Sequence, residues 1–132
     1  MTAVASKGRP YRTTTVEGFD ILIGKGDAEN DHLTFEVADP EDFWLHVGGG
    51  TAGSHVIIRN PDRLQQLPKR VIEQAAALAA WHSKARNARR VDVHVCRAKD
   101  VSKRRGTPAG QVMLRRWTRI RVQPSPVTED EE

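Results

Sequence analysis

The segment from Trp44 to Arg59 constrains the fold more than any other part of the chain. Apolar residues alternate on both sides of Gly48 to Gly53, a stretch whose glycines allow turn conformations that other residues rarely adopt. A period of two indicates strands rather than helices. The pattern therefore predicts a hairpin of two strands joined by a flexible loop.

The register of this hairpin decides which side chains share a face. Pairing Val47 with Ser54 across the loop sets His46 opposite His55. Two faces then separate, one with Trp44, His46, His55, Ile57 and Arg59 and the other with Leu45, Val47, Val56 and Ile58. Imidazole, indole and guanidinium groups can stack on bases and donate to phosphates, so we interpret the first face as an exposed binding surface. The alternative is an ordinary hairpin whose histidines are satisfied by local hydrogen bonds.

Positive charge is concentrated in one part of the chain. Residues 67–122 carry 15 Lys and Arg against 3 Asp and Glu, whereas residues 1–66 carry 6 against 10 and residues 123–132 carry none against 4. Such a field attracts polyanions, so it indicates nucleic-acid binding, with a solvated basic face as the alternative. We expect the acidic run Glu129 to Glu132 to screen the basic segment and to lower non-specific binding.

The length of 132 residues suits one domain with a single core. Cys96 is the only cysteine, so no disulfide can form within the chain, and a reducing cytoplasm is the expected location. The longest apolar stretch is too short to cross a bilayer, so no membrane contact is expected. Residues 1–9 and 123–132 are expected to be disordered on either side of a domain spanning residues 10–122.

Local patterns predict the elements that precede the central hairpin. An opening hairpin, a loop and a short helix are expected in that order, over Tyr11 to Thr15 with Asp20 to Ile23, then Gly24 to Asp31, then Leu33 to Val37. Asp31 is the predicted cap of the short helix, which should stop at Asp39-Pro40.

The second half begins with the clearest helix, from Pro68 to about Arg86, where alanines give high helix propensity. Val91 to Cys96 alternates as a half-buried strand, and a basic loop follows it. Gln111 to Val122 fits two alternatives, one unbroken strand or a hairpin with its tip at Arg116-Trp117. The predicted fold class is α+β, an antiparallel sheet packed against one main helix plus a short helix.

Five histidines, at positions 32, 46, 55, 82 and 94, raise the question of metal binding or acid-base catalysis. No pair has ligand spacing on a helix and no Cys-x-x-Cys is present, so neither a metal site nor a cofactor is predicted. A ribonuclease that uses His46 and His55 as base and acid remains a third hypothesis.

Several spaced motifs together resemble one known family. Gly24-Lys25, Asn30-Asp31, Asp42 to Val47, Gly53 to Arg59, the alanine-rich segment from Glu73 to Ser83 and the loop from Val101 to Val112 follow one another in the order of the NFACT-R family. That family is an RNA-binding domain of large ribosome-associated quality-control factors, and it also occurs as small free-standing bacterial proteins. The resemblance covers roughly residues 10 to 122 and includes Lys25, Asn30 and Asp31 in a signature loop, although Asn30 and Asp31 could equally be turn and cap residues.

The resemblance implies non-catalytic binding of structured RNA, either transfer RNA or large-subunit ribosomal RNA, in translation or ribosome quality control. The second hypothesis is a protein-binding adaptor, and a monomer is expected. The candidate RNA-binding residues share positive charge, a stacking ring or a place in the family's motifs, and they are Lys25, Asn30, Asp31, Trp44, His46, Ser54, His55, Arg59, Lys103, Arg104, Arg105, Arg115, Arg116 and Trp117.

Overall fold

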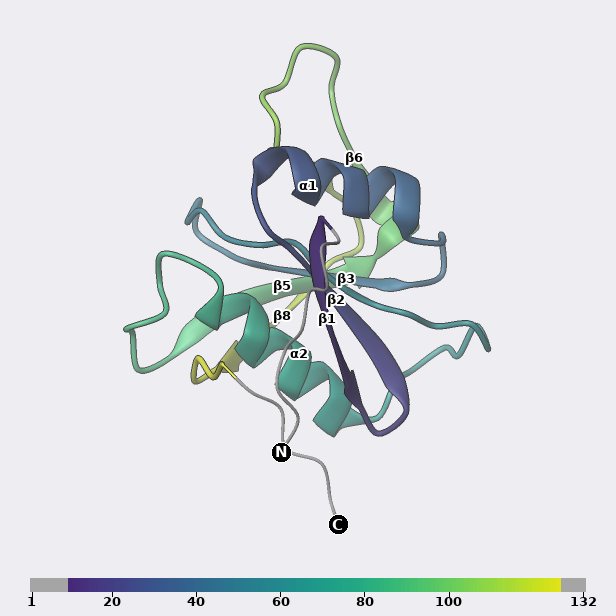
Figure 1. The fold of residues 1–132 in the computed structure, drawn as a ribbon, viewed down its shortest axis with the longest axis vertical. Coiled ribbons are helices and arrows are strands. Elements are labelled where there is room, and N and C mark those ends of the chain that lie inside the picture. The colour runs from purple at the N-terminus through teal and green to yellow at the C-terminus, as the bar shows by residue number, and fades with distance from the viewer. Residues whose placement is uncertain (1–9, 127–132) are drawn as a thin grey trace.

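Alternating apolar residues build a six-stranded antiparallel sheet in the computed structural model, which describes residues 10–126 (Figure 1). The strands lie side by side in the order β1, β2, β4, β3, β5, β8. Their bounds are Tyr11–Val16 for β1, Phe19–Gly24 for β2, Phe43–Val47 for β3, Val56–Ile58 for β4, Val91–Arg97 for β5 and Thr118–Val122 for β8. The predicted α+β class is confirmed.

Two helical elements cover opposite faces of the sheet. Helix α2, Lys69–Trp81, packs its small and apolar side chains on the face of Leu45 and Val93. Helix α1, Asp27–His32, continues as a π-helical turn over Leu33–Val37 and covers the face of Trp44. Figure 1 shows α1 on the upper side of the strands and α2 on the lower side. The molecule therefore has three layers, and both faces of the sheet are core.

The opening hairpin is confirmed, and each strand is slightly longer than predicted. Glu17 and Gly18 both have positive φ, at 48° and 83°, which is the conformation of a two-residue hairpin turn that matches strand twist. Glycine adopts the positive φ of the second position without strain.

The segment before the central hairpin differs from the prediction. Gly24 to Asp31 was expected to be a loop, but α1 begins at Asp27 and the helical segment runs on to Val37. Asp31 lies inside the helix, so its predicted role as the cap is wrong. The predicted stop before Pro40 holds, since Ala38 already has extended backbone.

Helix α2 is shorter than the predicted span to Arg86. It ends at Trp81 because the following backbone pairs with the central hairpin instead: Ser54 N–H donates to the His82 carbonyl at 2.8 Å, and Lys84 N–H donates to the Ala52 carbonyl at 2.9 Å. These two backbone hydrogen bonds hold the loop of the central hairpin against the end of α2.

The segment from Gln111 to Val122 follows neither predicted alternative. The chain turns at Arg116, where φ is +51°. On one side of the turn, β7, Met113–Leu114, pairs with β6, Val101–Ser102, and on the other side β8 pairs with β5. Because the two strands have different partners, the segment is neither one strand nor a hairpin. The small β6–β7 sheet follows a 3₁₀ turn over Ala98–Asp100 and was not predicted.

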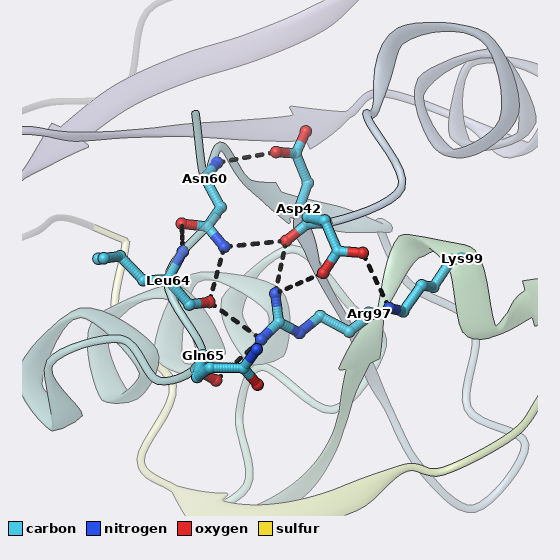
Figure 2. Close-up of polar contacts among 7 residues, drawn as sticks. Asp42, Asn60, Leu64, Gln65, Arg97 and Lys99 are labelled. Atoms are coloured by element: carbon cyan, nitrogen blue, oxygen red, sulfur yellow. Dashed lines mark hydrogen bonds and ion pairs between the residues drawn. The ribbon is translucent and has the colours of Figure 1, made fainter. Parts of the chain in front are cut away.

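A polar network holds the central hairpin at the end away from its loop (Figure 2). Asn60 N–H donates to the Asp42 carboxylate at 2.7 Å, and the Asn60 amide exchanges hydrogen bonds with the backbone of Leu64. The Arg97 guanidinium donates to the carbonyls of Leu64 and Gln65. These bonds fix the chain at Asn60, where it leaves the hairpin.

The chain stays attached to α2 beyond residue 123, where the disordered tail was expected to begin. Ser125 N–H donates to the Ala77 carbonyl at 3.1 Å. The acidic run Glu129 to Glu132 and residues 1–9 lie outside the described residues. Within residues 10–126, no helix has the length and hydropathy needed to cross a membrane.

Candidate nucleic-acid interface

Three histidines stand in one row across neighbouring strands. His46 pairs with His94 between β3 and β5, and His94 pairs with Arg119 between β5 and β8. The register of β3 with β4 continues to His46 opposite His55, as predicted. Paired residues point to the same face, and the ring centroids of His46 and His55 are 5.2 Å apart.

The face that carries this row is covered, which corrects the prediction of an exposed surface on the hairpin. Trp44 and His55 are each only 1% exposed, and Ile57 is fully buried. Leu33 and Val101 belong to the same core cluster and lie over this face. Alternation separated the two faces correctly, but it could not reveal a second covering layer. Trp44 and His55 therefore have no exposed ring surface for stacking on a base.

A chain of hydrogen bonds fixes the His55 ring. Its Nε2 lies 3.1 Å from the Gly110 carbonyl oxygen, which can only accept, so Nε2 carries the hydrogen. Nδ1 of the neutral ring accepts from the Thr34 hydroxyl at 2.9 Å, and that hydroxyl accepts from the Trp44 indole at 3.2 Å. Both nitrogens of His55 are occupied. His55 therefore has no free nitrogen with which to act as the acid or the base of the pair.

This buried ring makes the stability of the domain depend on pH. Burial, reinforced by the nearby His46, lowers the pKa of His55 from 6.5 to about 4. Between these values the unfolded chain binds a proton that the folded chain does not, so stability should fall as the pH drops, by up to about 3 kcal/mol. Urea unfolding across this range measures the loss.

The variant His55→Gln separates this contribution from others. It should flatten the dependence, leaving the parts that come from His82, whose pKa burial also lowers to about 4, and from His46, whose pKa burial also lowers. An equally steep loss of stability in the variant would contradict the role assigned to His55.

The loop of the central hairpin, residues 48–53, is called here the glycine loop. Gly49 and Gly50 have φ of +70° and +74°, which favours glycine at both positions. A Cβ on Gly48 would lie 2.5 Å from Nε2 of His94, so only glycine lets that imidazole lie against the backbone. The glycine loop therefore packs closely against the histidine row.

Asp31 holds residues 103–111 in place, and this segment is called here the basic loop. The Asp31 carboxylate accepts from Gly110 N–H at 3.1 Å and lies 3.2 Å from the Lys103 ammonium. Lys103 also donates to the carbonyls of Pro108 and Gln111. An ammonium has three donors, so Lys103 is fully used inside the protein. Asp31 and Lys103 therefore hold the loop, and Lys103 has no donor left for the predicted phosphate contact.

Two further predicted residues also act inside the protein. The Asn30 amide accepts from His55 N–H at 3.0 Å and donates to the Gly53 carbonyl at 3.2 Å. The Ser54 hydroxyl donates to the Gly24 carbonyl at 2.6 Å. Asn30 joins the central hairpin to α1, and Ser54 joins it to the end of β2, so their motif positions have a structural explanation.

A pocket of about 480 Å³, called here the histidine pocket, lies between the glycine loop and the basic loop. Its lining combines these loops with aromatic, apolar and imidazole groups, among them Trp44, His46, His55, His94, Val112 and Leu114. Burial lowers the pKa of His46, so its ring is neutral at physiological pH. A pocket of this size and lining can admit a nucleobase or a ribose.

The predicted cations divide into paired and unpaired groups. Arg59 lies 3.2 Å from the Asp42 carboxylate and donates to the Val37 carbonyl at 2.7 Å, so it holds the fold together. Arg115 lies 3.8 Å from Asp100. Four other predicted cations are exposed and form no ion pair with any residue of the described chain, namely Lys25, Arg104, Arg105 and Arg116. Acidic groups thus neutralise part of the basic segment, and these four remain available.

Trp117 is 46% exposed and stacks on His94, with ring centroids 4.2 Å apart. Its place near the surface among arginines was predicted, and the alternative of a Trp folded into the core is wrong. His94 also lines the histidine pocket. The indole therefore offers a stacking surface beside that pocket.

Sequence reasoning missed a second group of polar and aromatic residues. Trp81, His82, Lys84 and Arg86 come together with Lys25 around another pocket. The signal was present in the basic residues after the alanine-rich segment, but the prediction placed them on a continuing helix. The early end of α2 brings them to the glycine loop.

Comparison with known proteins finds one matching family, described as the NFACT protein RNA binding domain, over residues 9–116. Similar proteins include the Rqc2 homolog RqcH of Bacillus subtilis, 37% identical over 102 residues, which make up 77% of this chain and 17% of that protein. The Rqc2 homolog RqcH of Streptococcus suis is 37% identical over 128 residues, 96% of this chain and 22% of that protein. The chain thus spans about a fifth of the length of these relatives.

A solved structure has the same fold. The C-terminal part of the fibronectin/fibrinogen-binding protein from Streptococcus suis matches with a TM-score of 0.80 and 35% sequence identity. The match covers 91% of this chain and 47% of that chain. At this identity the similarity concerns both sequence and fold.

Proposed function

Because the chain belongs to the NFACT RNA-binding domain family, we propose that it binds structured RNA without chemical catalysis, as transfer RNA or as large-subunit ribosomal RNA. Its relatives named Rqc2 homolog RqcH support a role connected with ribosome quality control. The exposed cations and the pocket described above support this proposal.

One observation carries this proposal. The basic loop closes the histidine pocket with Ala109, Gly110 and Gln111, and the same loop carries the exposed, unpaired Arg104 and Arg105. Figure 1 shows this loop, coloured light green, projecting beyond α1. A projecting loop with exposed arginines beside a partly apolar pocket suits a ligand with phosphates and bases. Phosphate contacts position the RNA strand, and ring contacts hold a base.

Each exposed residue has a proposed role. Arg104, Arg105 and Arg116 contact backbone phosphates, and Trp117 stacks on an unpaired base. The neutral His46 ring donates to or accepts from a ribose hydroxyl or base edge in the pocket. The predicted site residues that are buried hold this surface in place through their contacts inside the protein.

Charge reversal of the basic loop tests the proposal. Arg104→Glu with Arg105→Glu should weaken transfer RNA binding by about tenfold or more, because two phosphate contacts become repulsive. Arg63→Glu with Lys69→Glu is the matched control, since these exposed cations flank the opposite end of the central hairpin and the net charge changes equally. Filter binding or fluorescence anisotropy measures both. Equal weakening in the two variants would contradict a site at the basic loop.

A further inference from the structure

A second pocket, of about 320 Å³, lies on the other side of the glycine loop. Ala52 and Gly53 of the loop line both this pocket and the histidine pocket, as does Asp27, so the two pockets are neighbours. A Cβ on Gly53 would lie 2.6 Å from the Ser83 side chain, so Gly53 packs closely against Ser83, while Ala52 is exposed and contributes only a methyl group. The boundary between the pockets therefore carries no large side chain at Ala52 and Gly53.

Positive groups from two separate segments surround the second pocket. Lys25 follows β2, and Lys84 and Arg86 follow α2. None of these three forms an ion pair with another residue between 10 and 126. Asp27 also lines the pocket, but its carboxylate lies near Gly110, on the side of the histidine pocket. The second pocket therefore has an excess of positive charge.

The surroundings of His82 are a second indication of excess positive charge at this pocket. Nε2 of this histidine is buried and has no hydrogen-bond partner in the described part of the protein. Besides burial, the charges of Arg12 and Arg86 disfavour its protonated form. A buried polar atom beside unneutralised cations is a position where an anion adds favourable contacts.

We propose that the second pocket holds a backbone phosphate of the same RNA whose base enters the histidine pocket, with the strand crossing the glycine loop at Ala52 and Gly53. This inference rests on the proposed function. Lys25, Lys84 and Arg86 contact the phosphate, and the small residues Ala52 and Gly53 leave room for the strand to pass from one pocket to the other. The ligand is thus a single-stranded or unpaired segment of RNA, since a base inside a duplex cannot leave the stack to enter a pocket without loss of pairing.

The test uses the full chain, a short single-stranded oligoribonucleotide and the variant Lys84→Ala with Arg86→Ala. The expected result is binding about five- to tenfold weaker, with a log-log salt slope less steep by about 0.7, the value for one phosphate of a single strand. Arg89→Ala with Arg90→Ala is the control, because these exposed cations follow directly in sequence and lie outside the second pocket. The control should change affinity by less than about twofold. Thermal unfolding checks that both variants fold.

The negative results of this test can be distinguished from one another. If the wild-type chain binds no RNA, the proposed function and this inference both fall. If the wild-type chain binds RNA and the Lys84 and Arg86 variant keeps the same affinity and slope, only this inference falls. Inorganic phosphate that shifts the His82 ring resonances while the variant still binds the oligoribonucleotide normally would mean a site for free phosphate, which also overturns it.

Discussion

Replacing Asp42 by alanine should destabilise the domain by about 2 to 4 kcal/mol, because it removes a buried carboxylate that has several partners. Asp42 is 1% exposed, and its carboxylate accepts from the backbone N–H groups of Asp39 at 2.9 Å and Asn60 at 2.7 Å. It also lies 3.2 Å from the Arg59 guanidinium. Alanine would leave two backbone N–H groups without their acceptor and would remove the shorter of the two ion pairs of Arg59.

Urea denaturation measures this loss, with Asp39→Ala as the control. Asp39 also pairs with Arg59, at 3.6 Å, but its side chain is mostly exposed, so its loss should cost less than about 1 kcal/mol. Asp42→Asn keeps one acceptor oxygen and should fall between the two. A loss below about 1 kcal/mol for Asp42→Ala would contradict a central role for this carboxylate.

Asn30→Ala should cost about 2 to 4 kcal/mol, because it removes two hydrogen bonds from a residue that is 2% exposed. The buried His55 N–H and the Gly53 carbonyl would lose their partner together. The glycine loop would then be held less firmly, and the His55 amide should exchange with solvent much faster than in the wild-type chain.

Glu29→Ala is the matched control, since Glu29 is the half-exposed neighbour of Asn30 on the same helix. It should change the free energy of unfolding by less than about 0.5 kcal/mol. If Asn30→Ala and Glu29→Ala gave equal stability and equal amide exchange, Asn30 would not be the link between α1 and the central hairpin.

The central hairpin shows how much of the site the sequence predicts. Strand alternation and an assumed pairing of Val47 with Ser54 were enough to set His46 opposite His55, because a register has only a few solutions once one face must be apolar. Alternation cannot tell whether the polar face meets water. That depended on contacts between distant segments, such as Val101 over Trp44, which no local pattern encodes.

The charge distribution was also predictable only in part. The excess of Lys and Arg after residue 67 was visible in the sequence, but the partners of Lys103 and Arg115 were not, because ion pairs with Asp31 and Asp100 depend on the tertiary fold. The end of α2 was also unpredictable from helix propensity, since tertiary pairing of residues 82–84 with the glycine loop overrides it. Lys84 and Arg86 were therefore placed on a helix rather than at a pocket.

Salt dependence also separates RNA binding from binding to a protein partner, the other function considered. Each phosphate neutralised on RNA releases counterions and contributes to a linear fall of log affinity with log salt. An adaptor that binds an acidic protein surface releases far fewer ions. An acidic protein in the same buffer series is therefore a useful comparison ligand.

The most direct measurement is the affinity of the wild-type chain for purified transfer RNA over a series of salt concentrations. If Lys25, Arg104, Arg105 and Arg116 each meet a phosphate, the log-log plot should be linear with a slope of about −3 to −4. A slope near zero, or no binding at low salt, would contradict the claim that these unpaired cations form an RNA-binding surface.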